Sequence, residues 1–324
     1  MSTPADLRPW TARWRMAWWL RTGRVVRGFD PGELPGLTAS HPLVDTPPDE
    51  VDEHAALEGR DPWFHNHLVV ASRAVAAALG NTCRPGARVL DFGCGEGVTA
   101  LGVARRTGAE VWGVDLTRAF DALPARAEQA LGPGACPPSL AFGQAAAGEP
   151  LPAPDAVFDA GYAWSVFEHL DDVPGTLREL HRVLKPGAPF LLQIEPLYFS
   201  PYGSHLRRLI DEPWAHLKGG DAAYLARAQA AADHSRVVER DLLYQQNDFE
   251  EVRRYLLGEY RSLNRIRTVD LVRQVREGGW QIEDCALRQI SARRLEPDLL
   301  RRHSAHDLRT REIRLLLKRP VTPR

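Results

Sequence analysis

Residues 89–98 read VLDFGCGEGV, a short apolar run with one acid that leads into three glycines at alternate positions. Residues 87–90, apolar except for Arg88, are typical of the end of a buried strand, whereas residues 98–106 return to helical spacing. Glycine allows positive φ angles and lets a ligand approach the backbone, and the N-terminus of a following helix presents unpaired N–H groups. The stretch therefore predicts a ligand-binding turn between a strand and a helix.

The spacing of the glycines separates two classes of ligand. A dinucleotide-binding turn of the form G-x-G-x-x-G would have its third glycine at the position of Val98, but the third glycine here is Gly97. Asp91 stands two residues before the first glycine, Gly93. A carboxylate at this position suits a positively charged ligand better than a pyrophosphate. The spacing and the acid therefore favour S-adenosylmethionine, which has an amino group and a sulfonium but no phosphate.

The acid and the three glycines, Asp91, Gly93, Gly95 and Gly97, resemble motif I of the class I S-adenosylmethionine-dependent methyltransferases, with a Rossmann-like, methyltransferase type 11-like domain. The resemblance implies an α/β fold, in which a seven-stranded, mostly parallel sheet has helices on both faces and an antiparallel last strand. Residues 311–320 would supply that last strand. The resemblance also implies S-adenosyl-L-methionine as the cofactor and S-adenosyl-L-homocysteine as its product.

Three further stretches resemble landmarks of the same family, in the same order. Residues 109–117 contain Asp115 at the end of a strand, about twenty residues after the glycine turn, where nucleotide-binding α/β folds place an acid for the ribose hydroxyls. Residues 142–172 resemble the stretch from the adenine side into the fourth strand, with Gln144 where an acid is common. Residues 177–196 resemble the helix, Lys-Pro-Gly turn and fifth strand. The predicted cofactor-binding residues are Asp91, Gly93, Cys94, Gly95, Gly97, Asp115, Leu116, Gln144, Ala145 and Ala163.

The composition fits an enzyme domain and argues against several other classes. The 324 residues are 44% hydrophobic, enough for a sizeable core, and no apolar run is long enough to span a bilayer. The formal net charge is −1, and the arginine-rich C-terminal part has almost no aromatic residues, so we expect no nucleic-acid partner. The four cysteines lack the spacing of a zinc site or a disulfide framework, which predicts a reducing, cytoplasmic setting.

Residues 1–60 form a predicted N-terminal extension and linker, ahead of a methyltransferase domain at residues 61–324. Tryptophans recur at intervals of four from Trp10 to Trp18, among several arginines, which places them on one face of a predicted helix. We favour packing of this face on the catalytic domain or on a second copy in a homodimer. The alternative is that residues 1–28 lie in a membrane interface and bring the enzyme to a lipid-linked substrate.

Residues 197–264 are too long for a bare connection between the fifth and sixth strands and predict a mostly helical cap. His205 and His216 are the candidate catalytic bases, because a histidine can accept a proton from a hydroxyl or amine as it is methylated. A structural hydrogen-bonding role is the alternative for each, and Glu168 and His169 are weaker candidates. No third ligand stands at a recognisable spacing from the two histidines, so we predict no metal. The predicted substrate-pocket residues are Tyr198, Phe199, Tyr202 and Trp214.

The combined motifs predict a methyltransferase that acts on a small molecule. O- or N-methylation of a natural product, a sugar or a lipid-linked intermediate is the expected reaction, and the candidate histidines favour oxygen as the acceptor atom. Two other classes stay open. The first is a non-catalytic partner or scaffold that retains the cofactor fold, which Gln144 in place of an acid supports. The second is a NAD(P)-dependent oxidoreductase, which the glycine spacing disfavours.

Overall fold

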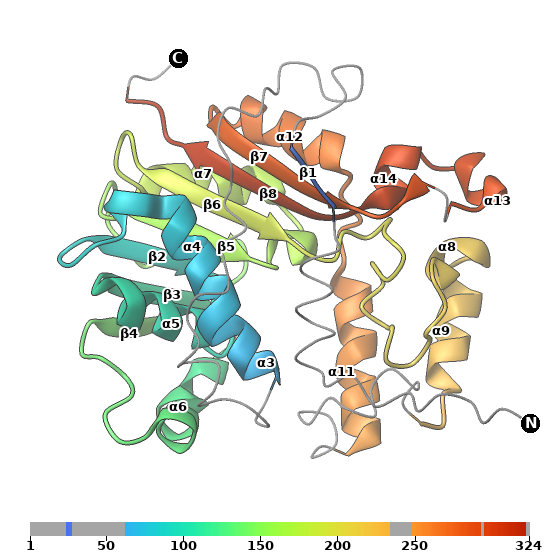
Figure 1. Ribbon diagram of the computed structural model, residues 1–324, viewed down its shortest axis with the longest axis horizontal. Helices are drawn as coiled ribbons and strands as arrows, with labels where there is room; N and C mark the ends of the chain where they lie inside the picture. Colours follow the sequence, from blue (N-terminus) through green and yellow to red (C-terminus); the bar gives the residue numbers. More distant parts are fainter. Residues whose placement is uncertain (1–23, 28–61, 234–247, 293–294, 322–324) are drawn as a thin grey trace, which may run out of the picture.

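The computed structural model describes residues 24–27, 62–233, 248–292 and 295–321, drawn in colour in Figure 1. The tryptophan face predicted near the N-terminus lies outside these residues. One sheet forms the centre of the described part, with strand order β1-β7-β8-β6-β5-β2-β3-β4. Its strands are β1 (Arg24–Arg27), β2 (Arg88–Phe92), β3 (Glu110–Asp115), β4 (Leu140–Gln144), β5 (Ala160–Trp164), β6 (Pro189–Ile194), β7 (Gln281–Gln289) and β8 (Thr310–Lys318). The helices used below are α4 (Ser72–Leu79), α5 (Val98–Thr107), α7 (Val173–Val183), α8 (Ala215–Lys218), α9 (Asp221–Gln229), α11 (Phe249–Ser262), α12 (Thr268–Glu277) and α13 (Pro297–Leu300).

Seven of the strands form the predicted Rossmann-like sheet. The pairs β2–β3, β2–β5, β3–β4 and β5–β6 are parallel, whereas β8 is antiparallel to both of its neighbours, β6 and β7. Strands β2 to β7 therefore run in one direction and β8 in the other, which confirms the predicted fold class. An additional strand, β1, pairs antiparallel with β7 at the edge of the sheet. It falls inside residues 1–60, the predicted N-terminal extension and linker.

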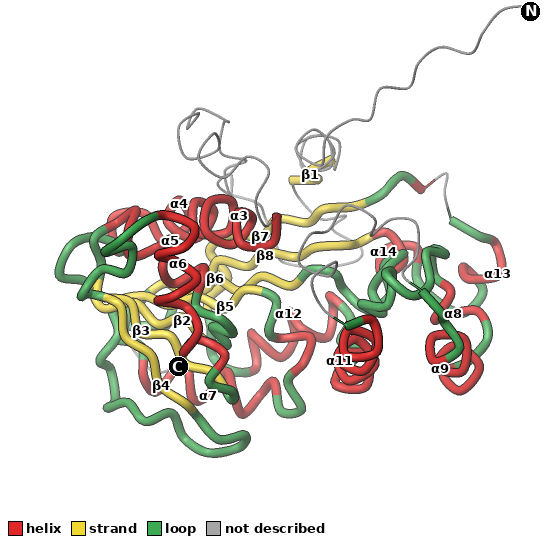
Figure 2. Tube along the Cα trace, turned by 90° about the horizontal axis from the view of Figure 1, so that it is seen from below, coloured by secondary structure: helices red, strands yellow, loops and turns green. Residues whose placement is uncertain are grey.

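Helices cover both faces of the sheet because successive residues of a strand point to opposite faces. Val89 and Leu191 belong to a core shared with residues of α4 and α5. Their neighbours Leu90 and Leu192 belong to a different core, shared with residues of α7 and α12. Figure 2 shows these two helix pairs on opposite sides of the strands. The near-continuous apolar strands of the sequence are thus explained by burial on both faces.

A separate apolar core lies in the predicted cap, residues 197–264. Tyr224 of α9 and Leu256 of α11 pack there with Tyr198 from the loop after β6. Figure 1 shows α8, α9 and α11 on the side of the molecule toward which the arrow of β6 points. Helices therefore form much of the described cap, from which residues 234–247 are excluded. The division of the chain at residue 60 stays a prediction.

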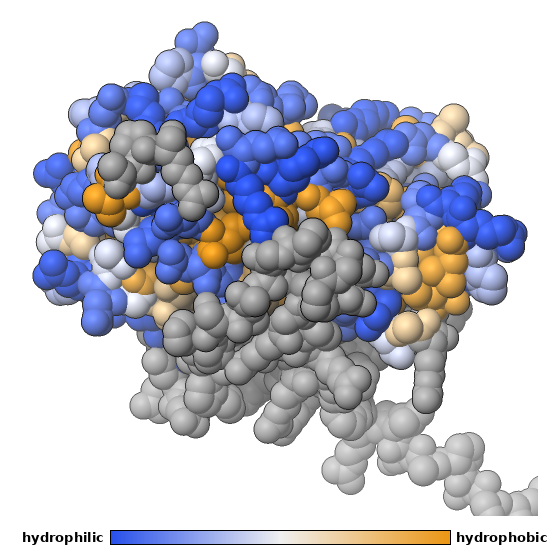
Figure 3. All heavy atoms as spheres, turned by 90° about the horizontal axis from the view of Figure 1, so that it is seen from above, coloured by the Kyte–Doolittle hydropathy of each residue, from blue (hydrophilic) through white to orange (hydrophobic). Residues whose placement is uncertain are grey.

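The surface of the described residues is mainly hydrophilic on the face in Figure 3, with small apolar groups among the charged side chains. Among the described helices, none combines the length and the apolar character that crossing a bilayer requires. All four cysteines are free, and two of them, Cys83 and Cys285, are buried. The larger apolar side chains gather mainly in the cores between the sheet, its helices and the cap.

Candidate active site

The glycine turn joins β2 to α5 at the edge where the parallel strands end. Gly93 and Gly97 have φ angles of +75° and +77°. A Cβ atom at Gly93 would lie 2.5 Å from Val166, and one at Gly97 would lie 2.5 Å from Phe142, so neither position has room for a side chain. Gly95 also has a positive φ, but a Cβ atom there would meet nothing within 4 Å. The turn is therefore packed at its two ends and open at its middle glycine, where a ligand can approach the backbone.

Asp115, the last residue of β3, fixes the shape of this turn. Its Oδ2 accepts a hydrogen bond from the backbone N–H of Gly95 at 2.9 Å, and its Oδ1 accepts one from the backbone N–H of Thr117 at 2.9 Å. The next residue, Leu116, is 57% exposed, which is unusual for a large apolar side chain beside a buried sheet. Gln144 donates from Nε2 to the carbonyl of Leu116 at 2.9 Å, which leaves its amide oxygen to accept another donor.

Asp91 lies beneath the turn and has an unusual environment for a carboxylate. It is only 2% exposed, and its Oδ2 has no hydrogen-bond partner among the described residues. Burial raises the pKa of Asp91 to about 7, and the nearby carboxylate of Asp115 adds to the shift. The hydroxyl of Tyr162 lowers the pKa of Asp91 only in part. A buried carboxylate oxygen without a partner is costly, so a ligand that brings an amino group to Oδ2 would be favoured. Asp91 and the open face of Gly95 therefore fit a positively charged cofactor.

The remaining predicted cofactor residues lie in two kinds of place. Cys94 belongs to the turn, where its backbone N–H donates to the carbonyl of Val114 at 3.0 Å. Ala145 follows β4 and donates from its backbone N–H to the carbonyl of Asp115 at 2.9 Å. Ala163 is fully buried in β5 and packs in the core shared with α7 and α12. The structure thus places Cys94 and Ala145 at the ligand edge and the side chain of Ala163 inside the sheet core.

A second group of polar side chains lies beside the glycine turn. Glu168 and His169 follow β5, two and three residues after Val166, and His205 comes from the loop after β6. One ligand atom from each of these three residues lies within 4.8 Å of the others. Burial raises the pKa of Glu168 well above its usual range and lowers the pKa of His205 to about 3. His205 is therefore neutral near pH 7.

His216, the other candidate base, lies in the cap. Its Nε2 is 2.7 Å from the backbone carbonyl of Tyr198, to which it donates, and burial lowers its pKa to about 4. The predicted pocket residues Tyr198 and Trp214 are also buried in the cap core, whereas Phe199 and Tyr202 are half-buried. The structure thus brings His205 together with Glu168 and His169, and places His216 in the packing of the cap.

Sequence reasoning missed two residues that contact this group. His169 Nδ1 is 2.8 Å from the hydroxyl of Ser262, and its Nε2 is 3.6 Å from a carboxylate oxygen of Glu259. Both partners belong to α11, about ninety positions further along the chain. A single sequence gives no periodic signal for such a contact, since it depends on how the cap packs against the sheet.

Comparisons with known proteins agree with the sequence motifs over the central part of the chain. Residues 90–192 match the family model described as a methyltransferase domain. The O-methyltransferase resE of Aspergillus sclerotiorum is 32% identical over 132 residues, 40% of this chain and 48% of that protein. The 2-phytyl-1,4-naphtoquinone methyltransferase of Nostoc punctiforme is 39% identical over 115 residues, 35% of this chain and 46% of that protein. The chain therefore spans about half the length of these curated relatives.

Among solved structures, methyltransferases of low sequence identity also resemble this chain. The geranyl diphosphate C-methyltransferase from Streptomyces coelicolor has a TM-score of 0.47 and 13% identity, covering 87% of this chain and 88% of that one. The central segment, residues 90–192, is a methyltransferase domain, which confirms the family recognised from the sequence. The match confirms the prediction of a methyltransferase domain at residues 90–192, and S-adenosylmethionine stays the cofactor that the sequence motifs predict for it.

Proposed function

We propose that the chain is an S-adenosylmethionine-dependent methyltransferase whose acceptor is a small molecule with a hydroxyl or amino group. The observation that carries the proposal is the buried carboxylate of Asp91, whose Oδ2 has no hydrogen-bond partner among the described residues, beneath a glycine turn that is open at Gly95. S-adenosylmethionine supplies an activated methyl group on a sulfonium and brings an amino group that suits this carboxylate. Asp115 and Gln144 stand beside the turn, where they support binding of the ribose and the adenine.

The residues of this chain contribute positioning and the exclusion of water. The cap covers the side of the sheet on which β5 and β6 end, so an acceptor held there would be shielded from solvent. Correct placement of two reacting groups contributes several kcal/mol to catalysis, about 7 or more in favourable cases. His205 is neutral and has a free ring nitrogen among the described residues, so it is the candidate to receive a proton from the acceptor.

Oxygen is the acceptor atom that we favour, and a natural product, sugar or lipid-linked intermediate is the proposed class of substrate. Two of the relatives are named as O-methyltransferases, resE and a ubiquinone biosynthesis enzyme of Alkalilimnicola ehrlichii that is 36% identical over 113 residues. The four free cysteines support a reducing, cytoplasmic setting. The proposal includes no nucleic-acid partner, and membrane contact or dimerisation through residues 1–28 stays a prediction.

Titration calorimetry with S-adenosylmethionine, S-adenosylhomocysteine and NADH tests the cofactor. We expect Asp91→Asn to weaken binding of the first two about 10- to 100-fold, because a charge-assisted hydrogen bond is lost. Asp298→Asn, at an exposed carboxylate of α13, is the matched control and keeps the wild-type affinity. Selective binding of NADH, or equal affinities in the wild type and Asp91→Asn, would contradict the proposal.

The pKa of Asp91 gives the same experiment a pH dependence. Below about pH 7 the carboxyl of the free protein is protonated, and binding an amino group requires it to lose that proton. The affinity of the wild type for S-adenosylmethionine is therefore expected to fall by up to about tenfold per unit as the pH drops below 7. Asp91→Asn should show a flatter profile over the same range.

A further inference from the structure

The group formed by Glu168, His169 and His205 has a composition that the methyltransferase chemistry alone does not require. Glu168 and His169 belong to a 3₁₀ turn, η4 (Phe167–His169), that follows β5, and His205 belongs to the loop that follows β6. Because β5 and β6 are parallel neighbours, their carboxyl ends meet at one edge of the sheet. Two imidazoles and a carboxylate therefore converge from two separate segments, with one ligand atom of each within 4.8 Å of the others.

The hydrogen bonds of His169 determine which of its ring nitrogens carries the proton. The hydroxyl of Ser262 donates its only hydrogen to the backbone carbonyl of Glu259 at 2.8 Å. Ser262 must therefore accept, rather than donate, in its 2.8 Å contact with Nδ1 of His169. Nδ1 carries the proton of the neutral ring, and Nε2 presents a lone pair.

His205 is oriented in the same way. The backbone carbonyl of Pro196 raises the pKa of the ring by acting as an acceptor for it, and the buried Nε2 of His205 has no partner in the described part of the chain. Nδ1 is therefore the donor to Pro196, and Nε2 again presents a lone pair. Histidines that bind metal ions are commonly held by a hydrogen bond from the other ring nitrogen to a carbonyl or a polar side chain, which fixes the tautomer.

The contacts of the two carboxylates in this group, among the residues that the structure describes, include no arginine or lysine ion pair. Glu168 is 2% exposed, and neither of its carboxylate oxygens has a hydrogen-bond partner within the residues that the structure describes. A carboxylate oxygen of Glu259 lies 3.6 Å from Nε2 of His169, where the tautomer leaves no proton to share. Two ring nitrogens and the carboxyl of Glu168 thus gather in one place, with Glu259 beside His169, and a bound cation would replace the protons that such buried carboxyl groups otherwise retain.

We propose that Glu168, His169 and His205 bind a divalent transition-metal ion, with Glu259 beside them as a further carboxylate. Two imidazole nitrogens with one carboxylate suit zinc, iron(II) or cobalt(II), whereas magnesium and calcium prefer oxygen ligands. The inference departs from the sequence-based expectation of no metal. The proposed function enters only through the role of the ion, which is to hold an oxygen atom of the acceptor beside the cofactor edge. With the ion bound, Nε2 of His205 is a ligand, and the ion takes over from His205 the task of promoting loss of the acceptor's proton.

Cobalt(II) is the probe, because its visible absorption reports directly on the ligands. Protein freed of metal with EDTA and then dialysed is expected to bind one cobalt ion per chain and to develop this absorption, which zinc removes by displacement. Glu168→Gln and His205→Gln each delete one ligand and are expected to weaken cobalt binding at least about tenfold. His181→Gln, on α7 and outside the group, is the matched control and should bind cobalt as the wild type does.

Two results would overturn the inference. One is the absence of cobalt absorption in the wild type, and the other is unchanged cobalt binding in both ligand variants. Thermal unfolding of the wild type with and without zinc gives an answer that needs no variant, since a metal that binds only the folded chain must raise the melting temperature. No increase at saturating zinc would also contradict the site.

Calorimetry with S-adenosylmethionine on the same metal-free protein separates the two proposals. Cofactor binding without cobalt binding would reject the metal ion and leave the proposed function intact. Cobalt binding without cofactor binding would reject the proposed function and leave the metal site in place.

Discussion

Glu312 and Glu168 are two carboxylates that are each 2% exposed, yet their surroundings differ in charge. Glu312, on β8, accepts hydrogen bonds from Gln193 at 3.1 Å and from Arg314 at 2.6 Å, and lies 3.1 Å from a guanidinium nitrogen of Arg288. The backbone carbonyl of Glu168 accepts a hydrogen bond from the N–H of Asn264 at 2.8 Å, but its two carboxylate oxygens have no hydrogen-bond partner among the described residues. The carboxylate of Glu312 is thus surrounded by hydrogen-bond donors, whereas that of Glu168 lies among other acceptors.

The partners, and not the extent of burial, decide how the two carboxylates ionise. Burial alone would raise the pKa of Glu312, but the positive charges of Arg314 and Arg288 lower it below the usual range. Burial raises the pKa of Glu168, and the carboxylates of Glu259 and Glu195 raise it further. The charges around Glu312 are balanced within the chain, which fits a structural role. Those around Glu168 are not, which fits a place where a ligand supplies the missing charge.

The largest expected effect on stability comes from removing Arg288, the cation that lies between Glu312 and Glu195. Arg288→Met leaves Glu312 buried and short of one positive partner, and Glu195 loses a partner at 3.7 Å. Breaking a buried ion pair from one side costs about 3–5 kcal/mol, so we expect the free energy of unfolding to fall by that amount. Chemical denaturation at pH 7 measures it.

Arg301→Met is the control for that substitution, because the side chain of Arg301 is 70% exposed and its partner Asp298 is 75% exposed. Surface pairs of this kind contribute little to stability, so this variant should unfold within about 1 kcal/mol of the wild type. Equal losses in Arg288→Met and Arg301→Met would show that the cluster around Glu312 is not a stabilising unit.

The second prediction is a gain in the free energy of unfolding, and it concerns the group around Glu168. Because the pKa of Glu168 is raised in the folded chain, the folded state binds a proton that the unfolded state releases, and stability is lost as the pH rises above about 4.3. Glu168→Gln removes this loss. In EDTA, its stability relative to the wild type should grow with pH by up to about 1.4 kcal/mol per unit.

Denaturation of both proteins between pH 5 and pH 8 measures this difference. With zinc present the order should reverse, because only the wild type keeps all the ligands of the proposed site. A variant that is less stable than the wild type in EDTA at every pH would show that Glu168 has a stabilising partner in the chain.

The parts of the molecule that the sequence predicted are those with local signals. The glycine turn and Asp115 could be found because their spacing along the chain follows from the strand, turn and helix that they connect. The four residues of β1 show no such pattern, since their pairing depends on the edge of β7, about 260 positions away. Likewise, His205 and His216 rank equally as bases when only the sequence is considered, and the packing of the cap separates them.

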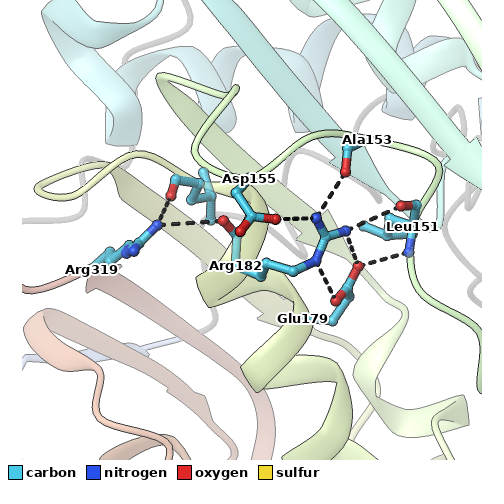
Figure 4. A network of polar contacts seen from close by, with 7 residues as sticks. Leu151, Ala153, Asp155, Glu179, Arg182 and Arg319 are labelled. Carbon is cyan, nitrogen blue, oxygen red and sulfur yellow. Dashed lines mark hydrogen bonds and ion pairs between the residues drawn. The ribbon is translucent and has the colours of Figure 1, made fainter. Parts of the chain in front are cut away.

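The smallest expected effect on stability concerns the hydrogen bonds of Arg182, whose charge is paired with carboxylates but is partly exposed to water. Arg182 donates to the carbonyls of Leu151 and Ala153 at 3.1 and 2.9 Å and to the carboxylates of Asp155 and Glu179, as Figure 4 shows. These bonds fasten the loop before β5 to α7. The side chain of Arg182 is 30% exposed, so water can replace part of what the guanidinium supplies.

Arg182→Met should therefore lower the free energy of unfolding by only about 1–2 kcal/mol, less than Arg288→Met, although Arg182 has more hydrogen bonds. Arg178→Met, on the same helix and 69% exposed, is the matched control and should change stability by less than about 0.5 kcal/mol. If Arg182→Met were as damaging as Arg288→Met, the number of hydrogen bonds, and not the burial of the charges they balance, would determine the stability of these clusters. The contrast between Glu312 and Glu168 would then lose its physical basis.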